Sequence, residues 1–352
     1  MNESLIKKDG LIIAGPCSAE SEEQLVTTAK RLAKTGMVDV LRAGIWKPRT
    51  NPGGFEGVGL KGLSWLSTAK KETGLPVGTE VATSRHVEDA LHYDVDVLWI
   101  GARTSVNPFS VQNIADALKG TDSTVLIKNP VNPDLKLWIG AVERIRNAGI
   151  TNIGLIHRGF SSYGNKEYRN APIWQIPIEM MRIFPDLPMI CDPSHIAGKR
   201  DTLHSVSQKS LDLHYNGLII ESHYKPEEAL TDKEQQVSPD QLSNLLNQLV
   251  WKKESINLPE YQQKIESLRE QINQFDDELI HLLQSRMIVA ENIGQLKKIN
   301  NVTVLQSNRW NEILEKMLSK TRNTKLSEDF VKSLMELLHV ESIRIQNDIS
   351  NR

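Results

Sequence analysis

The stretch GLIIAGPCS at residues 10–18 is a continuous apolar run that ends at a glycine, a proline and one of only two cysteines. Similar runs follow, each closed by a Gly, Pro or polar residue and separated from the next by a stretch with helical spacing. They read VDVLRAGIW (38–46), PVGTEVA (76–82), VDVLWIGARTS (95–105), STVLIKNP (123–130), NIGLIHRGF (152–160), PMICDPSH (188–195) and GLIIESHY (217–224). Apolar strands that alternate with helices indicate a parallel sheet covered on both faces. Eight such units in roughly 240 residues favour a closed (β/α)8 TIM barrel of the α/β class, and a doubly wound open sheet is the alternative.

Composition narrows the possible partners. The chain has 352 residues and a formal net charge of -2, so we expect neither nucleic acid nor an anionic membrane surface as a partner. No run approaches the roughly 20 apolar residues of a membrane span, and the first residues do not resemble a signal peptide. Two cysteines, Cys17 and Cys191, do not make a disulfide framework. We therefore expect a soluble protein of the reducing cytoplasm.

The strand pattern stops near residue 250, and a second region begins. We expect a barrel domain at 1–248, a linker at 249–261 (LVWKKESINLPEY) and an all-α domain at 262–352. In that domain, positions spaced alternately by four and three form one seam. They are Tyr261, Ile265, Leu268, Ile272, Phe275, Leu279, Leu282, Arg286, Val289, Ile293 and Leu296. The seam predicts a single helix of about 36 residues and about 54 Å, too long for a small domain to cover by itself, so we expect it to pack against a second chain. Two shorter helices are expected at 308–320 and 327–349.

Lys and Arg residues lie at or shortly after the ends of several predicted strands. They are Arg42, Lys47, Arg49, Arg103, Lys128 and Arg158. Reactive groups of a (β/α)8 barrel lie at the C-terminal ends of its strands, so these side chains should share one mouth. Such a cluster would repel itself without a strongly anionic ligand, and Arg and Lys bind phosphate and carboxylate groups well. The pattern predicts a small substrate with several negative charges.

A second group combines a thiol, an imidazole and two carboxylates. Cys17 follows the first predicted strand, His195 the seventh and Glu221 the eighth, and Asp232 lies in the loop beyond. Closure of a barrel would bring the first and last strands together. This mixed donor set suits a divalent transition metal such as Mn, Fe, Co or Zn, with Cys17 as a thiolate ligand.

Nine motifs carry a resemblance to a known family. They are GPCS, LRAGIWKPRTNPGGFEG, GTEVAT, IGARTS, IKNP, HRGF, CDPSH, IIESH and LTDKEQ, in this order within residues 10–245. Together they resemble the short, barrel-only type of 3-deoxy-arabino-heptulosonate 7-phosphate (DAHP) synthase. That family condenses phosphoenolpyruvate with erythrose 4-phosphate at the entrance to the shikimate pathway and uses a divalent metal.

The resemblance implies a role for each of these residues. The metal ligands would be Cys17, His195, Glu221 and Asp232. Phosphoenolpyruvate would be held by Lys47, Arg103, Lys128 and Arg158, with Arg42 in the same site, and the aldose phosphate by Arg49 and Thr50. Glu80 is a candidate for orienting the attacking water and Lys128 for proton transfer, although a structural salt bridge would explain either residue equally well. A synthase of the same fold that uses arabinose 5-phosphate is the less favoured alternative, because that family carries Ala-Asn after the lysine where this chain reads KPRT at 47–50.

The long predicted helix carries cations of its own. Arg286 interrupts the apolar seam, where an arginine is costly to bury unless it is paired, and a register fault or an arginine reaching to the edge are the alternatives. Lys297 lies eleven residues on and about 20° away around the helix, so both cations face one way. Arg269 is about 100° off that face and would reach the same pocket from a partner chain.

The stretch LREQINQFDDELIHLLQSRMIVAENIGQLKK at 268–298 resembles the first helix of the all-helical chorismate mutases, whose two chains intertwine. The resemblance implies a site of Arg269 from the partner, Arg286, Lys297, Arg309 and Gln346, which rearranges chorismate to prephenate without a cofactor. Trp310 and Gln306 stand where the family often carries acidic residues. An alternative is that this domain is a regulatory sensor through which prephenate or chorismate inhibits the barrel, and the two roles are compatible.

Overall fold

The computed structural model describes residues 5–7, 9–47, 53–162, 164, 167–252, 258–305, 307–321 and 324–350. The chain divides into two compact units, Met1–Glu254 and Ser255–Arg352, and each is described by itself. Among the described residues, none of the helices combines the length and the apolar character that a membrane crossing requires.

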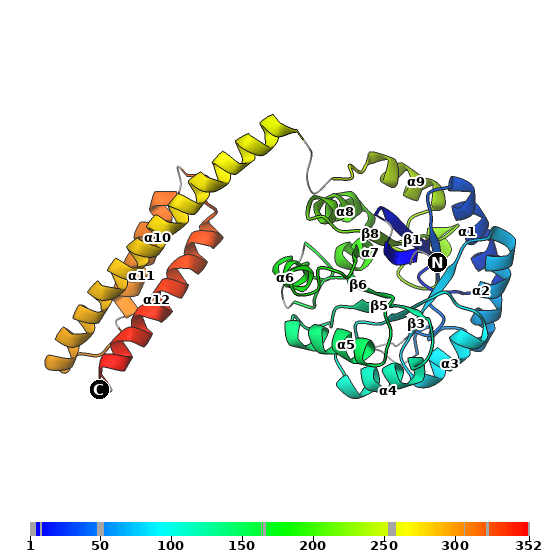
Figure 1. The fold of residues 1–352 in the computed structure, drawn as a ribbon, viewed down its shortest axis with the longest axis horizontal. Helices are drawn as coiled ribbons and strands as arrows, with labels where there is room; N and C mark the ends of the chain where they lie inside the picture. The colour runs from blue at the N-terminus through cyan, green and yellow to red at the C-terminus, as the bar shows by residue number, and fades with distance from the viewer. Residues whose placement is uncertain are drawn as a thin grey trace. The chain divides into compact units, whose positions relative to one another are not determined.

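The first unit is a closed barrel of parallel strands in sequential order, ringed by helices (Figure 1). The strands are β1 Leu11–Gly15, β2 Val40–Arg42, β3 Val77–Val81, β4 Val97–Ile100, β5 Thr124–Lys128, β6 Ile153–His157, β7 Met189–Cys191 and β8 Gly217–Glu221. β1 pairs with both β2 and β8, and the register places Gly15 opposite Glu221. The expected barrel is therefore confirmed, and the open-sheet alternative is wrong.

Helices lie between successive strands of the barrel and also before the first strand and after the last. They are α1 Glu22–Thr35, α2 Leu60–Thr73, α3 Ser84–His92, α4 Pro108–Leu118, α5 Leu135–Asn147, α6 Gln175–Ile183, α7 Pro193–Ala197, α8 Leu203–Asp212 and α9 Pro239–Gln248, with 3-10 helices η1 Leu5–Lys7, η2 Arg200–Thr202 and η3 Pro226–Glu228. Local sequence sets their ends. The Ser21 side chain accepts a hydrogen bond from the backbone of Gln24 at the start of α1, and a capping box of Ser238 and Gln241 starts α9.

Two apolar clusters stabilise the barrel. One fills the space between strands and helices. The other fills the interior and consists of Ile6, Leu11, Ile13, Val40, Val97, Trp99, Leu126, Ile156, Ile190 and Ile219. Trp99 is the largest member, and the Arg42 guanidinium lies 5.1 Å from its ring centre. The packed interior therefore forms a floor beneath the strand ends.

His157, at the end of β6, is fully buried in an aromatic cluster with Phe160, Trp174 and Tyr215. Its Nε2 donates to the Pro172 carbonyl at 2.7 Å, which leaves Nδ1 to accept from the Tyr215 hydroxyl at 3.1 Å. Burial lowers the pKa of His157 to about 3. The ring is thus held neutral, and we assign it a structural role.

This buried imidazole predicts a pH-dependent stability. Between its unfolded pKa of about 6.5 and its folded pKa of about 3, the unfolded chain binds one more proton, so the free energy of unfolding decreases as pH falls. The contribution is at most about 1.4 kcal/mol per pH unit. Urea unfolding at several pH values between 7 and 5 should give a steeper dependence for wild type than for His157→Gln, whose amide can still donate to the Pro172 carbonyl. Equal slopes would contradict the assignment.

The second unit is built from three helices, α10 Pro259–Ile299, α11 Ser307–Thr321 and α12 Glu328–Ser350. The expected long helix is confirmed at 41 residues. α12 packs against the C-terminal half of α10, where a Cβ on Gly294 would lie 3.1 Å from the Gln346 Cα, so only glycine permits this approach without a shift. Most seam positions of α10 carry exposed apolar side chains. They are Leu268, Ile272, Phe275 and Leu279 in its N-terminal half and Leu282, Val289, Ile293 and Leu296 beyond.

Candidate active sites

Three of the four expected metal ligands lie together at the mouth of the barrel. Ligand atoms of Cys17, Glu221 and Asp232 all lie within 4.8 Å of one another, and the Cys17 Sγ lies 3.2 Å from the Asp232 Oδ2. The β1–β8 pairing accounts for this meeting, because it places Gly15, two residues before Cys17, directly opposite Glu221. Residues more than 200 positions apart in the sequence thus form one cluster.

His195, the fourth expected ligand, lies at the edge of this cluster. Its Nε2 is 3.7 Å from the Glu221 Oε1, and its Nδ1 is 2.9 Å from the Asp192 carboxylate. Asp192 also accepts from the Lys128 Nζ at 2.9 Å. Burial would raise the pKa of Asp192, but the neighbouring His195 and Lys128 hold it well below its usual range. One buried carboxylate therefore orients both an expected metal ligand and an expected substrate cation.

The cluster fits a divalent cation. Burial opposes ionisation of Glu221, yet His195 and Arg42 hold its pKa below the usual value, and the Arg42 Nη1 donates to it at 2.8 Å. Burial and the Glu221 carboxylate raise the pKa of the Cys17 thiol to about 12, so thiolate forms there when a further cation compensates it. A thiol, an imidazole and two carboxylates match the donor preferences of divalent transition metals.

The expected substrate cations surround this cluster. The Lys47 Nζ lies 3.0 Å from the Cys17 Sγ, and the Lys128 Nζ lies 5.9 Å from the ring centre of Trp99. Burial, together with nearby Arg169 and Arg103, lowers the pKa of Arg158 to about 10. This concentration of cations at one mouth is suited to an anionic ligand. Arg49 and Thr50 lie outside the described residues.

Glu80, at the end of β3, faces the same mouth. Its Oε2 accepts from the Trp99 Nε1 at 2.9 Å. A Cβ on Gly101 would lie 2.2 Å from the Glu80 Oε1, so the glycine leaves room for this carboxylate. The Trp99 indole thus fixes one oxygen of Glu80.

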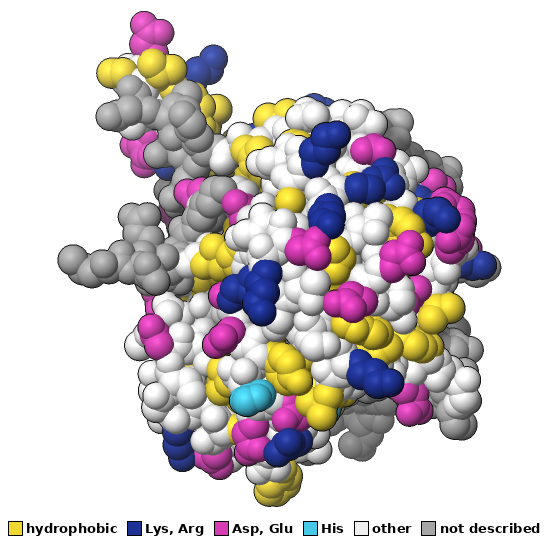
Figure 2. Space-filling model, turned by 90° about the vertical axis from the view of Figure 1, so that its right-hand side faces the viewer, with side chains coloured by type: hydrophobic (Ala, Val, Ile, Leu, Met, Phe, Trp, Pro, Cys, Tyr) yellow, Lys and Arg dark blue, Asp and Glu magenta, His cyan; other side chains and the backbone are white. Residues whose placement is uncertain are grey.

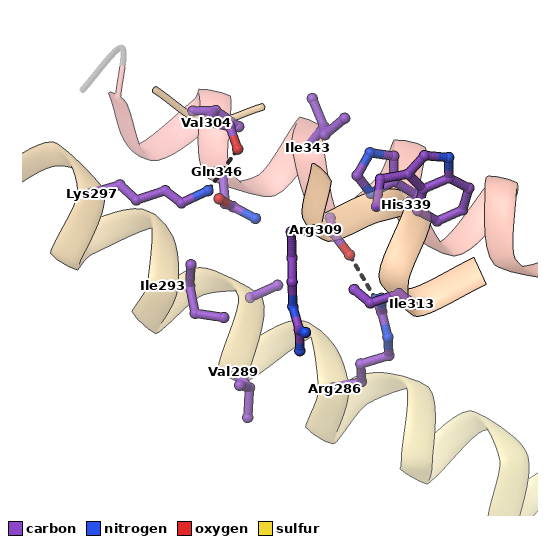
Figure 3. Close-up of a pocket in the computed structure, with 13 residues that line it drawn as sticks. Arg286, Val289, Ile293, Lys297, Val304, Arg309, Ile313, His339, Ile343 and Gln346 are labelled. Atoms are coloured by element: carbon purple, nitrogen blue, oxygen red, sulfur yellow. Dashed lines mark hydrogen bonds between the residues drawn. The ribbon is translucent and has the colours of Figure 1, made fainter. Parts of the chain in front are cut away.

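The helical unit contains a pocket of about 440 Å³ (Figure 3). Its lining includes Arg286 and Lys297 from α10, Arg309 and Trp310 from α11, and His339, Ser342 and Gln346 from α12. The Arg286 Nη1 donates to the Ser342 Oγ at 2.6 Å, and the Lys297 Nζ donates to the Val304 carbonyl at 2.6 Å. Three cations therefore face one cavity, and within it Arg286 is hydrogen-bonded to the neutral hydroxyl of Ser342.

Two stacked aromatic rings form one wall of this pocket. Trp310 stacks on His339 with ring centres 4.2 Å apart, and partial burial with Arg286 nearby lowers the pKa of that histidine. The stack forms an uncharged wall beside the cations.

Two further expected residues are not among the described residues that line this pocket. Arg269 lies outside the pocket lining and is 66% exposed. Gln306 lies outside the described residues.

Comparison with known proteins identifies both units. Residues 6–258 match the model of the DAHP synthetase I family. The chain belongs to the DAHP synthetase I family. Residues 268–347 match the chorismate mutase type II model, so this DAHP synthetase I chain carries a chorismate mutase domain as its second unit.

The relatives that match the barrel carry two different enzyme names. The chain is 34% identical over 238 residues to a phospho-2-dehydro-3-deoxyheptonate aldolase of Thermotoga maritima, covering 68% of each chain. It is 29% identical to a 2-dehydro-3-deoxyphosphooctonate aldolase of Desulfotalea psychrophila, covering 68% of this chain and 88% of the relative. The crystal structure of the Thermotoga maritima DAHP synthase superposes with a TM-score of 0.60 at 33% identity, covering 68% of this chain and 67% of that one. A truncated form of the Thermotoga enzyme gives 0.58 at 31% identity, covering 68% and 84%.

Some residues of the DAHP synthase site escape sequence reasoning. Asp192 occurs in the CDPSH motif after β7, but only its contacts with His195 and Lys128 reveal its role. Gln235 donates to the Glu221 Oε2 at 2.7 Å, and the Gln236 Oε1 accepts from the Cys17 backbone at 2.9 Å. Their occurrence in or next to the LTDKEQ motif was the one available signal.

Proposed function

We propose that the barrel condenses phosphoenolpyruvate with erythrose 4-phosphate to DAHP and phosphate, with a divalent metal held by Cys17, His195, Glu221 and Asp232. The observation that carries the proposal is the thiol and carboxylate cluster beside buried cations at one mouth. The cations suit the phosphate and carboxylate of phosphoenolpyruvate, and the donor set suits an ion that binds an aldehyde oxygen. A reduced Cys17 fits a cytoplasmic setting.

The chain's own residues divide the work. Lys47, Arg103, Lys128 and Arg158 hold phosphoenolpyruvate, with Arg42 beside it, and Arg49 and Thr50 hold the aldose phosphate. The bound ion supplies Lewis-acid polarisation of the aldehyde oxygen. Lys128, held by Asp192, is placed for proton transfer, and Glu80, held by Trp99, for orienting the water that attacks the cationic carbon. Pre-set geometry of this kind lowers the barrier because no group must reorganise during the reaction.

A paired assay tests the substrate and the metal together. We expect turnover of phosphoenolpyruvate with erythrose 4-phosphate, and little with arabinose 5-phosphate, because residues 47–50 read KPRT. A chelator should abolish this turnover, since the ion is needed to polarise the aldehyde, and added Mn²⁺ should restore it. Preference for arabinose 5-phosphate, or full activity in chelator, would contradict the proposal.

We infer that the helical unit rearranges chorismate to prephenate in a homodimer whose partner donates Arg269. The exposed apolar seam on the N-terminal half of α10 supports the dimer, because such a surface is costly in water and suits a second copy of the same helix. The Arg286, Lys297 and Arg309 cluster supports a dicarboxylate ligand, with Gln346 beside it.

A second role is proposed for the same pocket, inhibition of the barrel by bound prephenate or chorismate. The Trp310–His339 stack favours this role. The stacked rings leave the cations free to bind the ligand carboxylates, but neither ring supplies an acidic group that could hold the substrate hydroxyl. Addition of prephenate to the barrel assay tests this role.

A further inference from the structure

Arg169, in the segment between β6 and α6, is an arginine that the reaction outlined above does not use. Its Nη1 donates to the Asp232 Oδ1 at 2.9 Å and to the Gln235 Oε1 at 2.7 Å. The side chain is 46% exposed, yet its guanidinium contacts the cluster of expected metal ligands through Asp232. Its contacts run to Asp232, an expected ligand, and to Gln235, whose amide nitrogen donates to Glu221.

Through these two contacts Arg169 reaches three expected metal ligands. Asp232 is touched directly, and its other oxygen, Oδ2, lies 3.2 Å from the Cys17 Sγ. Gln235 accepts from Arg169 through its oxygen, so its amide nitrogen is left to donate to the Glu221 Oε2 at 2.7 Å. The guanidinium thereby decides which end of the Gln235 amide faces Glu221 and which oxygen of Asp232 faces the thiol.

Asp232 has an unfavourable backbone conformation, and a different arginine holds its loop. Asp232 has a φ of 48°, in the left-handed region that non-glycine residues rarely adopt. The loop that carries it is anchored separately by Arg200, which donates to the carbonyls of Lys233 and Gln236 at 2.8 and 2.6 Å. Arg200 therefore holds the loop backbone, whereas Arg169 holds the side chains.

The fold also makes room for Arg169 next to the fourth ligand. A Cβ on Gly198, just after α7, would lie 2.4 Å from the Arg169 Cβ, and Gly198 has a φ of 69°. The neighbouring Asn170 donates from its side chain to the His195 carbonyl at 2.6 Å. The segment that carries Arg169 is thus joined directly to the helix that carries His195.

Arg169 also places a positive charge beside one of the two carboxylates. Ionised groups in a largely buried site are costly unless they are paired. Arg42 pairs with Glu221 and Arg169 with Asp232, so each carboxylate has its own guanidinium. Groups that hold ligands in this way commonly change metal affinity by about 10–100-fold.

We propose that Arg169 is a positioning residue of the metal centre, which orients Asp232 directly and Glu221 through Gln235. This inference rests on the proposed metal-dependent function. Arg169 fixes the carboxylate oxygens before the ion arrives and ties them to the β6–α6 segment, so removing it lowers metal affinity even in the absence of substrates.

The test is equilibrium binding of Mn²⁺ and Co²⁺ to the metal-stripped full chain, without substrates. For Arg169→Gln we expect the Kd to rise by about 10–100-fold and the absorption of the Co²⁺–thiolate complex to change. Arg182→Gln is the matched control, because Arg182 is an exposed arginine on α6 whose described ion pair is with Glu179, away from the expected ligands, and its Kd should stay near that of wild type.

The outcomes separate the two levels of the argument. Unchanged metal affinity and Co²⁺ absorption in Arg169→Gln, or equal weakening in both variants, would overturn the positioning role while the metal-dependent function stands. If Arg169→Gln does not fold, Arg169→Lys keeps the charge but not the two-point contact, and an unchanged Kd there would overturn the role equally. A wild-type chain that binds neither ion and works in chelator would overturn both proposals.

Discussion

Replacing Cys17 by serine should lower the metal-dependent condensation by at least about 100-fold and reduce the bound metal in parallel. The Cys17 Sγ lies 3.2 Å from the Asp232 Oδ2 and 3.0 Å from the Lys47 Nζ, so the thiol lies between an expected ligand and an expected substrate cation. A hydroxyl at this place cannot supply a thiolate to a borderline-soft ion. Metal content and initial rates of the purified variant, at saturating phosphoenolpyruvate, measure the effect.

Cys191→Ser is the matched control. Cys191 is also fully buried, and it hydrogen-bonds Ser210, a contact that a hydroxyl can keep. Its substitution should leave metal content and turnover close to wild type. A Cys17→Ser enzyme with unchanged activity and metal content would remove the thiolate from the mechanism, whatever the control does.

Replacing Arg286 by alanine should abolish most rearrangement of chorismate, with a loss of at least about 100-fold in kcat/KM. The side chain enters the helical pocket held by Ser342 at 2.6 Å, and a pre-positioned cation stabilises the charge that separates as the ether bond breaks. The condensation catalysed by the barrel should be retained. Chorismate loss and prephenate formation, followed for the full chain, measure the effect.

Arg344→Ala provides the control for this variant. Arg344 is an exposed arginine on α12 that pairs with Glu341 and Asp348 and does not line the pocket, so its removal should leave the rearrangement unchanged. Equal activity of Arg286→Ala and wild type would contradict the catalytic assignment. A wild-type chain without turnover whose barrel is still inhibited by prephenate would leave only the sensor role.

Dimers that combine two different variant chains test whether the mutase site is shared between the two chains. Chains with Arg269→Ala and chains with Arg286→Ala should each be inactive as pure dimers. After the chains are unfolded and refolded together, about half of the dimers are mixed, and each mixed dimer holds one intact site of two. Recovery of about one quarter of wild-type activity is expected, and no recovery would contradict the donation of Arg269 by the partner.

Much of the architecture could be predicted from patterns along the chain. Each barrel strand is an uninterrupted apolar run because both of its faces are buried, and the seam of the long helix is visible because steps of four and three keep apolar residues on one face of a helix. The four expected ligands and the cations could be named for a similar reason, because each directly follows such a run or occurs in a motif. The seam does not mark the start of α10, because the helix begins at Pro259 and the seam at Tyr261.

Patterns along the chain are enough to predict the barrel, the helical unit and the residue types at the strand ends, because periodicity and strand-end position are local properties of a chain. The groups that hold those residues are visible in the folded structure alone. They are Asp192 between His195 and Lys128, Trp99 against Glu80, and Gln235 between Arg169 and Glu221. Apart from the contact of Asp192 with His195, these contacts join residues 14 to 66 positions apart in the sequence. They depend on barrel closure and on side-chain geometry within a few tenths of an ångström, which leave no periodic trace in the sequence.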